Sequence, residues 1–206
     1  RAKDFQAKGD IKSSVIELKS AIQKDPNNPQ ARWILGELYI KKRMGTEAEK
    51  ELKKAEELGV SDESIKVLLG EALLLQGEYK RILDEIQPTQ ETTPLNRARI
   101  HRQRGEALLG LGHLEEGCNL FENAKEAFAN YAPAYRTLAQ CSIAQLNYDE
   151  AKVRLDEALK IDVRDADTWA QLGSLELIRD NVQAAKSAFL KAQSIDRAHI
   201  QASMGL

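Results

Sequence analysis

Four arginines and a histidine stand close together near the middle of the chain. These residues, within eight positions of one another, are Arg97, Arg99, Arg102 and Arg104, with His101 among them. Guanidinium groups bind anions through paired hydrogen bonds. One hypothesis is therefore an anion site for an acidic peptide terminus or an acidic polysaccharide. The alternative, which is usual for runs of charge and is favoured here, is a solvated helix face paired with Glu71 and neighbouring acids.

The other reactive side chains form no pattern that predicts catalysis. The three histidines stand at unrelated places, with no His or Cys at metal-ligand spacing. The acids of residues 162–167 could suggest calcium, but a turn that ends in a helix N-cap at Asp165 explains them better. No nucleophile stands beside a base. The sequence therefore indicates no metal, no cofactor and no enzyme.

Composition excludes several classes of protein. The 206 residues include 30 Lys and Arg against 32 Asp and Glu, for a net charge of −2. This balance, with one short basic cluster that lacks interleaved aromatics, argues against nucleic-acid binding. The mean hydropathy of −0.48 and the short apolar runs argue against a membrane-embedded chain. Abundant Ala, Leu, Glu, Lys and Gln favour helix.

The chain repeats itself about every 34 residues. Segment 166–173 aligns with segment 132–139. Small residues recur one period apart at Gly36, Gly70, Gly105, Ala139 and Gly173. A second register carries Ala48, Ala151 and Ala185, and a third carries large apolar residues at positions 18, 52, 86, 121, 155 and 189. Several independent registers therefore agree on one repeating unit.

This pattern of Leu-Gly, aromatic and Ala positions resembles the tetratricopeptide repeat family over essentially the whole chain. The resemblance implies an all-α fold, a right-handed α-α superhelix (a solenoid of antiparallel helix pairs) in a single array over 1–206. Within it, 1–28 is a partial repeat and 200–206 starts a further repeat. The complete repeats are 29–62, 63–97, 98–131, 132–165 and 166–199.

The small residues predict where helices touch. Glycine inside a helix costs roughly 0.5–1 kcal/mol relative to alanine. Its recurrence at Gly36, Gly70, Gly105 and Gly173 therefore predicts close contact between the two helices of a pair. Repeat 63–97 is irregular, because its second helix is expected to end near Ile86, just before Pro88.

The turns and the cysteines follow from the same register. Arg43 and Asp180 stand where other repeats have the turn residues Gly77 and Gly112, and we expect the turn to persist. Cys118 and Cys141 fall on adjacent helices. A disulfide is compatible with this placement in an oxidising compartment, but buried free thiols are favoured.

In the resembled family the first helices line a concave groove, at the second, fifth, ninth and twelfth positions of each repeat. The partner-binding residues that the resemblance implies are Trp33, Glu37, Ile40, Val67, Glu71, Leu74, Arg99, Arg102, Glu106, Leu109, Arg136 and Gln140. They form an apolar row beside an acidic row, with arginines in the middle repeats. Trp33 is either a binding anchor or packs beneath the preceding half-repeat.

Some stretches resemble one branch of the family in particular. Segments 8–28 and 31–39, the truncated unit 77–86 and the run 104–112 are similar to repeat lipoproteins that accompany exosortase and PEP-CTERM sorting systems. This resemblance implies a periplasmic or outer-membrane-anchored protein, with a signal peptide and a lipidated cysteine upstream of Arg1. The residues themselves leave a cytoplasmic location open.

The leading functional hypothesis is a non-catalytic scaffold that binds a peptide or partner-protein segment in its groove. The second is a module that holds an acidic polysaccharide during export. The Lys/Asn carboxylate clamp of the family's chaperone-binding branch is absent, since the corresponding pairs include Trp33/Glu37 and Arg102/Glu106. A heat-shock co-chaperone role is therefore disfavoured.

Overall fold

The structure is a computed structural model that describes residues 11–60, 63–197 and 199–205. Helices account for 79% of these described residues, and no strand occurs among them. The predicted all-α fold is confirmed. The chain divides between His113 and Leu114 into two compact units, which are described separately. The right-handed winding of the whole array stays a prediction.

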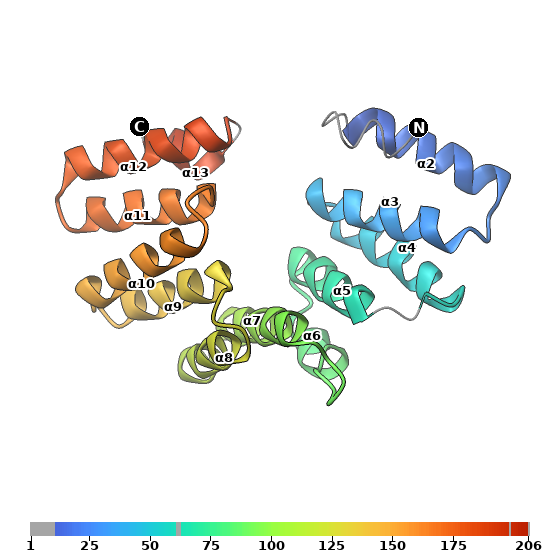
Figure 1. The fold of residues 1–206 in the computed structure, drawn as a ribbon, viewed down its shortest axis with the longest axis horizontal. Helices are drawn as coiled ribbons and strands as arrows, with labels where there is room; N and C mark the ends of the chain where they lie inside the picture. The colour runs from blue at the N-terminus through green and yellow to red at the C-terminus, as the bar shows by residue number, and fades with distance from the viewer. Residues whose placement is uncertain (1–10, 61–62, 198, 206) are drawn as a thin grey trace. The chain divides into compact units, whose positions relative to one another are not determined.

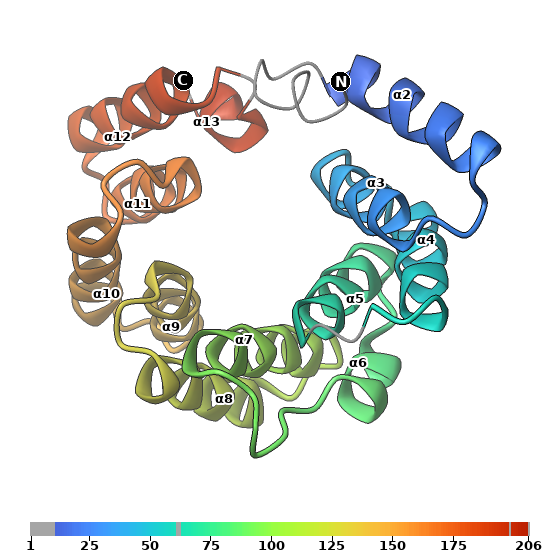
Figure 2. The ribbon, with the colours of Figure 1, turned by 45° about the vertical axis from the view of Figure 1, so that its right-hand side comes forward.

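Unit 1 consists of antiparallel helices in two layers. Its helices are α2 (Ile11–Lys24), α3 (Pro29–Lys41), α4 (Gly45–Glu57), α5 (Glu63–Gln76), α6 (Tyr79–Glu85) and α7 (Pro94–Gly110). In Figure 2, α3, α5 and α7 form one layer and α2, α4 and α6 form the other. Helices that follow one another along the chain pack together, and so do the successive helices α3, α5 and α7 within their layer. The core of the unit lies between the two layers.

Unit 2 continues the same hairpin pattern. Its helices are α8 (Leu114–Ala127), α9 (Ala132–Ala144), α10 (Tyr148–Ile161), α11 (Ala166–Ile178), α12 (Val182–Ile195) and α13 (Ile200–Met204). Figure 1 shows α9 to α12 stacked as successive hairpins, and the contacts between neighbouring helices agree. Among the first helices, α3, α5, α9 and α11 begin at the first residues of predicted repeats, whereas α7 begins at Pro94, ahead of residue 98.

The predicted helix N-cap at Asp165 is confirmed, and Asn28 caps α3 in the same way. The side chain of Asn28 accepts a hydrogen bond from the Ala31 backbone at 2.9 Å, and Asp165 accepts one from the Asp167 backbone at 3.1 Å. Asp162 accepts a hydrogen bond from the backbone of Arg164. The acids of segment 162–167 thus serve the turn and the start of α11, as expected of capping residues.

Close contact at the repeated glycines is confirmed for two helix pairs and wrong for one. A Cβ atom on Gly36 would lie 2.6 Å from Leu52, and one on Gly173 would lie 2.6 Å from Phe189. Both neighbours belong to the second helix of the same pair. A Cβ on Gly70 would instead strike Gln103 of α7, in the next repeat. The short helix α6 leaves this place to the fully buried Gln103 side chain.

The predicted turns persist without glycine. Arg43 and Asp180 adopt φ values of 59° and 62°, the left-handed conformation that Gly77 and Gly112 also adopt. Leu146 does the same with φ of 61° in the turn between α9 and α10, which the sequence analysis did not anticipate. A left-handed backbone costs a residue with a side chain about 1–2 kcal/mol.

Replacing Leu146 by glycine is therefore expected to stabilise the protein. Its side chain is 72% exposed, so little packing is lost. Relief of the left-handed strain outweighs the extra freedom of glycine in the unfolded chain, for a net gain of about 0.5–1 kcal/mol in the free energy of unfolding. Urea unfolding measures this gain. Gly77→Ala, the reverse exchange at an equivalent turn, should destabilise by a similar amount, and a loss of stability in Leu146→Gly would contradict the argument.

Helix α6 is short, and arginines compensate for its early end. It stops at Glu85, which confirms the predicted end near Ile86. Carbonyl groups in the last turn of a helix have no partner within the helix. Nη1 of Arg104 donates to the carbonyls of Leu83 at 2.7 Å and Ile86 at 3.1 Å. Arg104 thus links α7 to the end of α6.

A partly buried ion pair holds α6 against α4. Arg81 donates to Glu49 at 2.6 Å, and the Glu49 side chain is only 13% exposed. The hydrogen bond from Arg81, with others from Gln76 and Lys53, outweighs burial and lowers the pKa of Glu49 to about 2. The carboxylate therefore stays ionised through most of the acidic range.

Arg81→Ala is expected to lower the free energy of unfolding at pH 7 by about 1–2 kcal/mol. Because the pKa of Glu49 is depressed in the folded state, its stabilisation is complete above the ordinary value of 4.5 and disappears as pH falls towards 2. The deficit of the variant should shrink over that window. Urea unfolding between pH 7 and pH 2.5 measures it. Lys80→Ala, an exposed neighbour, serves as the control, and a deficit constant with pH would refute the linkage.

Candidate functional site

A groove lies between α9 and α11 in unit 2. Its cavity has a volume of about 450 Å³. The side chains that line it are Arg136, Gln140, Ile143, Asp167, Gln171, Ser174 and Ile178. On each helix these residues are three or four positions apart, so they share one helix face. The repeat register, which sets the spacing of these residues on α9 and α11, therefore determines which side chains line the groove.

The charged end of the groove is neutralised within the protein. Nη1 of Arg136 donates to Asp165 and to Asp167, each at 3.0 Å. Asp167 also bonds Nε2 of His199 at 3.0 Å. Burial tends to raise the pKa of Asp167, but Arg136 and His199 together outweigh it and lower that pKa. Arg136 is thus committed to carboxylates of its own chain.

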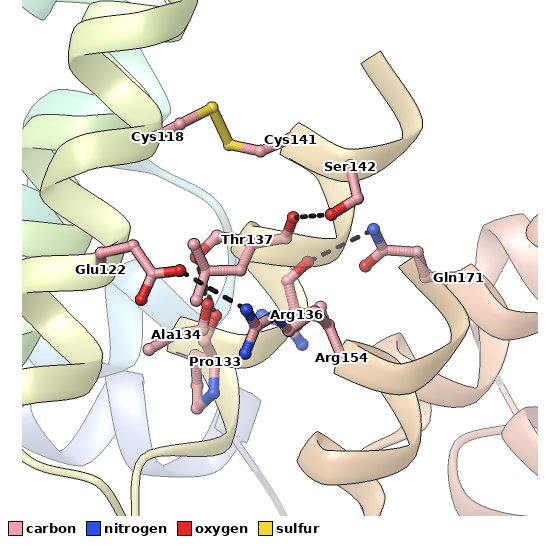
Figure 3. The surroundings of a disulfide bond; sticks show 11 residues. Cys118, Glu122, Pro133, Ala134, Arg136, Thr137, Cys141, Ser142, Arg154 and Gln171 are labelled. Carbon is pink, nitrogen blue, oxygen red and sulfur yellow. Dashed lines mark hydrogen bonds and ion pairs between the residues drawn. A yellow bond between two sulfur atoms is a disulfide. The ribbon is translucent and has the colours of Figure 1, made fainter. Parts of the chain in front are cut away.

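The rest of the groove is uncharged. Gln140 is exposed, and Gln171 is mostly buried, with its amide nitrogen donating to the backbone carbonyl of Arg136 at 3.4 Å (Figure 3). Each glutamine offers both hydrogen-bond donors and acceptors. Ile143 and Ile178 supply apolar surface, and Ile178 is 52% exposed. The groove can therefore bind a ligand that alternates polar main-chain groups with apolar side chains.

A disulfide fixes α9 to α8. Cys118 and Cys141 are bonded, with their Cα atoms 5.9 Å apart. The expectation of free thiols is thus wrong: the register that brings α8 beside α9 also brings the two Cβ atoms within bonding reach. Figure 3 shows the disulfide on α9 together with Arg136, whose side chain lines the groove. The disulfide therefore restrains the helix that carries half of the groove.

A second, smaller cavity of about 210 Å³ lies beside the disulfide. Glu122 of α8 and Glu150 and Arg154 of α10 line it. Arg154 bonds Glu150 at 2.8 Å and approaches Glu122 to 3.7 Å, an ion pair that Figure 3 shows between α8 and α10. These charges join α8 and α10, which both pack against α9.

The arginine run does not form an anion site among the described residues. Arg102 is ion-paired with Glu71 and with Glu106, as the favoured alternative predicts. Arg97 donates to carbonyls of the 89–92 connector, and Arg104 to the end of α6. Arg99 donates to Asn96. The cluster thus holds the irregular part of unit 1 together.

His101 lies within this basic cluster and is half-buried. Burial lowers its pKa most, and the charges of Arg104 and Arg97 lower it further. Both effects disfavour the imidazolium form. His101 is therefore a neutral packing residue at neutral pH, and its buried Nδ1 atom has no hydrogen-bond partner in the described part of the chain.

The remaining predicted binding residues lie on α3, α5 and α7. Two that were expected on an exposed face are buried instead, Val67 at 5% and Arg102 at 8% exposure. Val67 packs into the core of unit 1, and Arg102 is enclosed by its carboxylate partners. The half-buried residues are Trp33, Glu37, Ile40, Glu71, Leu74, Arg99, Glu106 and Leu109. Their role in binding stays a prediction.

The groove contains residues that the sequence analysis missed. Of its lining, only Arg136 and Gln140 were among the predicted binding residues. Asp167 is the second residue of repeat 166–199. The family register marks this position as groove-facing, so the register could have identified it. Gln171 and Ile178 lie about one and about three turns further along the same face of α11.

Over the described ranges, no three His, Cys, Asp or Glu side chains gather in a way that could hold a metal ion. No helix in those ranges has the length and hydropathy to cross a membrane.

Three solved structures are similar to this chain in fold. Pseudomonas aeruginosa PilF is 17% identical, with a TM-score of 0.64, over 98% of this chain and 92% of that one. The type IV pilus biogenesis factor PilW is 16% identical, with a TM-score of 0.67, over 98% and 94%. A chain of the APC/C hetero-tetramer Cut9–Hcn1 is 14% identical, with a TM-score of 0.72, over 98% of this chain and 40% of that one. At such low identities, the structural similarity shows a shared fold and nothing more.

Family profiles agree with the structure. No curated protein matches the sequence significantly. A profile described as tetratricopeptide repeat matches residues 6–66 and 108–175, and a second profile of the same description matches 166–199. With more than half of the sequence matched, the chain belongs to the tetratricopeptide repeat family.

Proposed function

We propose that this protein is a non-catalytic scaffold that binds an extended segment of a partner protein in the groove between α9 and α11. Tetratricopeptide repeats generally mediate protein–protein interactions. The observation that carries the proposal is the lining of the groove, where Gln140 and Gln171 lie beside Ile143 and Ile178.

An extended peptide matches this lining. Its main chain presents one donor and one acceptor at almost every residue. The amides of Gln140 and Gln171 can satisfy both kinds of group. Ile143 and Ile178 can bury an apolar side chain, which supplies most of the favourable free energy. The groove therefore suits a peptide with an apolar residue flanked by uncharged main chain.

An acidic polysaccharide is a weaker candidate for the same surfaces. Such a ligand needs cations that are available to its carboxylates. Arg102 is bonded to Glu71 and Glu106, and Arg136 to Asp165 and Asp167. Binding a polysaccharide at either arginine would first break these pairs, which costs free energy. We therefore rank this hypothesis second.

We also propose that the protein works in the cell envelope, in a sorting or exopolysaccharide-export system. The Cys118–Cys141 disulfide supports an oxidising compartment, because disulfides are rare in reducing ones. The resemblance to exosortase-associated lipoproteins points to the same place. Alkylation of intact cells before lysis tests the compartment. Cysteines protected from alkylation until a reductant is added would support it, and directly alkylated thiols would refute it.

The peptide proposal is tested by a double substitution. Gln140→Ala with Ile178→Ser removes one amide and one apolar contact from exposed positions, so the fold should persist. We expect the dissociation constant for peptides selected from an unstructured dodecapeptide library to rise at least tenfold, which corresponds to about 1.4 kcal/mol. Fluorescence anisotropy measures it. Gln183→Ala, an exposed change on α12, is the matched control. Unchanged affinity in the double variant would exclude the groove.

A further inference from the structure

One acidic side chain on the layer formed by the first helices α3, α5 and α7 has no ion-pair partner among the described residues. Glu37 lies on α3, four residues after Trp33, so the two side chains are neighbours on one helix face. Both are half-buried. Glu37 forms no hydrogen bond or ion pair with any described residue, and burial raises its pKa, which Lys41 one turn later only partly offsets.

Three acids on the corresponding face of the other first helices, Glu71, Glu106 and Asp167, do form ion pairs. Glu71 and Glu106 share Arg102, and Asp167 is paired with Arg136 and His199. The difference follows from the repeat register. Arg102 is the fifth residue of repeat 98–131 and reaches the ninth residue of the preceding repeat, Glu71.

The residue that corresponds to Arg102 in the preceding repeat is Val67. It is buried in the core of unit 1 and carries no charge for Glu37. A half-buried carboxylate without a cation is an unfavourable arrangement unless a ligand supplies the missing charge. Glu37 is thus complementary to a cation from outside the chain.

Trp33 provides the second half of the site. Its ring packs partly against the core of unit 1, and its Nε1 atom is buried with no hydrogen-bond partner among the described residues. Trp169, by contrast, donates its Nε1 hydrogen to the Val163 carbonyl at 2.8 Å. Indole rings are the best aromatic surface for cations, and guanidinium groups stack on them readily. Trp33 and Glu37 together offer a ring and a carboxylate within one helical turn.

We propose that Trp33 and Glu37 on α3 bind the arginine or lysine side chain of a basic peptide segment. The carboxylate of Glu37 pairs with the charged end of that side chain, and the Trp33 ring contacts its flat or methylene surface. The inference shares with the proposed function only the class of ligand, because it rests on unit 1 and not on the groove of unit 2.

Nuclear magnetic resonance of the full chain tests this site with a built-in reference. The chain has two tryptophans, so the indole N–H region contains two signals. The probe is the capped tripeptide acetyl-Gly-Arg-Gly-amide, and the matched neutral probe replaces arginine by citrulline. We expect the arginine probe to shift the Trp33 signal and leave that of Trp169 in place, while the citrulline probe shifts neither.

Glu37→Gln should weaken binding of the arginine probe about tenfold, since it removes the charge but keeps the shape. Glu47→Gln, an exposed acid on α4, is the matched control and should bind as the parent does. The spectrum itself reports whether each variant is folded. An unmoved Trp33 signal, or equal shifts in Glu37→Gln and the parent, would overturn the proposal. The groove variants on α9 and α11 bear on the proposed function alone, so the two can fail separately.

Discussion

Replacing Cys118 and Cys141 together by alanine is expected to lower the free energy of unfolding by about 3 kcal/mol. The disulfide closes a loop between residues 23 apart in sequence, and its removal frees that loop in the unfolded chain. Alanine is chosen because Cys141 is buried, and a serine hydroxyl there would need a partner. Urea unfolding followed by circular dichroism measures the loss.

Reduction provides the control for this prediction. The parent protein treated with a reductant should unfold at nearly the same urea concentration as the double alanine variant, whereas the variant should not respond to the reductant. Because α9 carries both Cys141 and Gln140, we also expect weaker peptide binding in the reduced parent. Coincident unfolding curves for the oxidised parent and the variant would show that the disulfide contributes nothing to stability.

Features set by the repeat were predictable because they depend on spacing alone. The 34-residue period places Gly36 and Gly173 against Leu52 and Phe189, as the structure shows. The same logic fails at Gly70, because α6 has only seven residues and Gln103 of α7 occupies the place. A shortened helix changes which side chain packs against the glycine. The residues of a single repeat do not show this change.

Partners of charged groups were harder to predict. The sequence analysis named Glu71 as a partner for the arginine run but no partner for Arg136, whose carboxylates are Asp165 at the end of its own repeat and Asp167 in the next one. Which arginine finds a carboxylate depends on distances across the helix packing. Glu37 is informative because it has no ion pair with any described residue, and the residue one repeat later that could supply a cation is the buried, uncharged Val67. To predict the ion pairs of a first helix, the charged residues of the neighbouring repeat therefore have to be considered together with its own.

The disulfide and the groove were also only partly predictable from the sequence. The register could place Cys118 and Cys141 on adjacent helices, but only the helix packing decides whether the Cβ atoms meet. Likewise Arg136 and Gln140 were identified from α9 alone, whereas Gln171 enters the groove because α11 packs alongside. Single-helix features follow from the sequence, and features shared by two helices require the structure.

Gly173→Ala is expected to destabilise the protein by about 2–3 kcal/mol, although alanine is the better helix former by about 1 kcal/mol. The new Cβ would lie 2.6 Å from Cε1 and 2.7 Å from Cδ1 of Phe189. That ring is 1% exposed, and its opposite edge faces Gly205, so it has no free space to move into. Thermal and urea unfolding measure the loss.

The steric origin of this effect is tested by a second substitution. Phe189→Leu alone should destabilise, because it leaves a cavity in the core of unit 2. Combined with Gly173→Ala it should cost less than the sum of the two single changes, since the smaller side chain leaves room for the new methyl group. Additive losses would instead place the cost of Gly173→Ala in the backbone of α11. The packing of α11 against α12 would then not depend on the small size of Gly173.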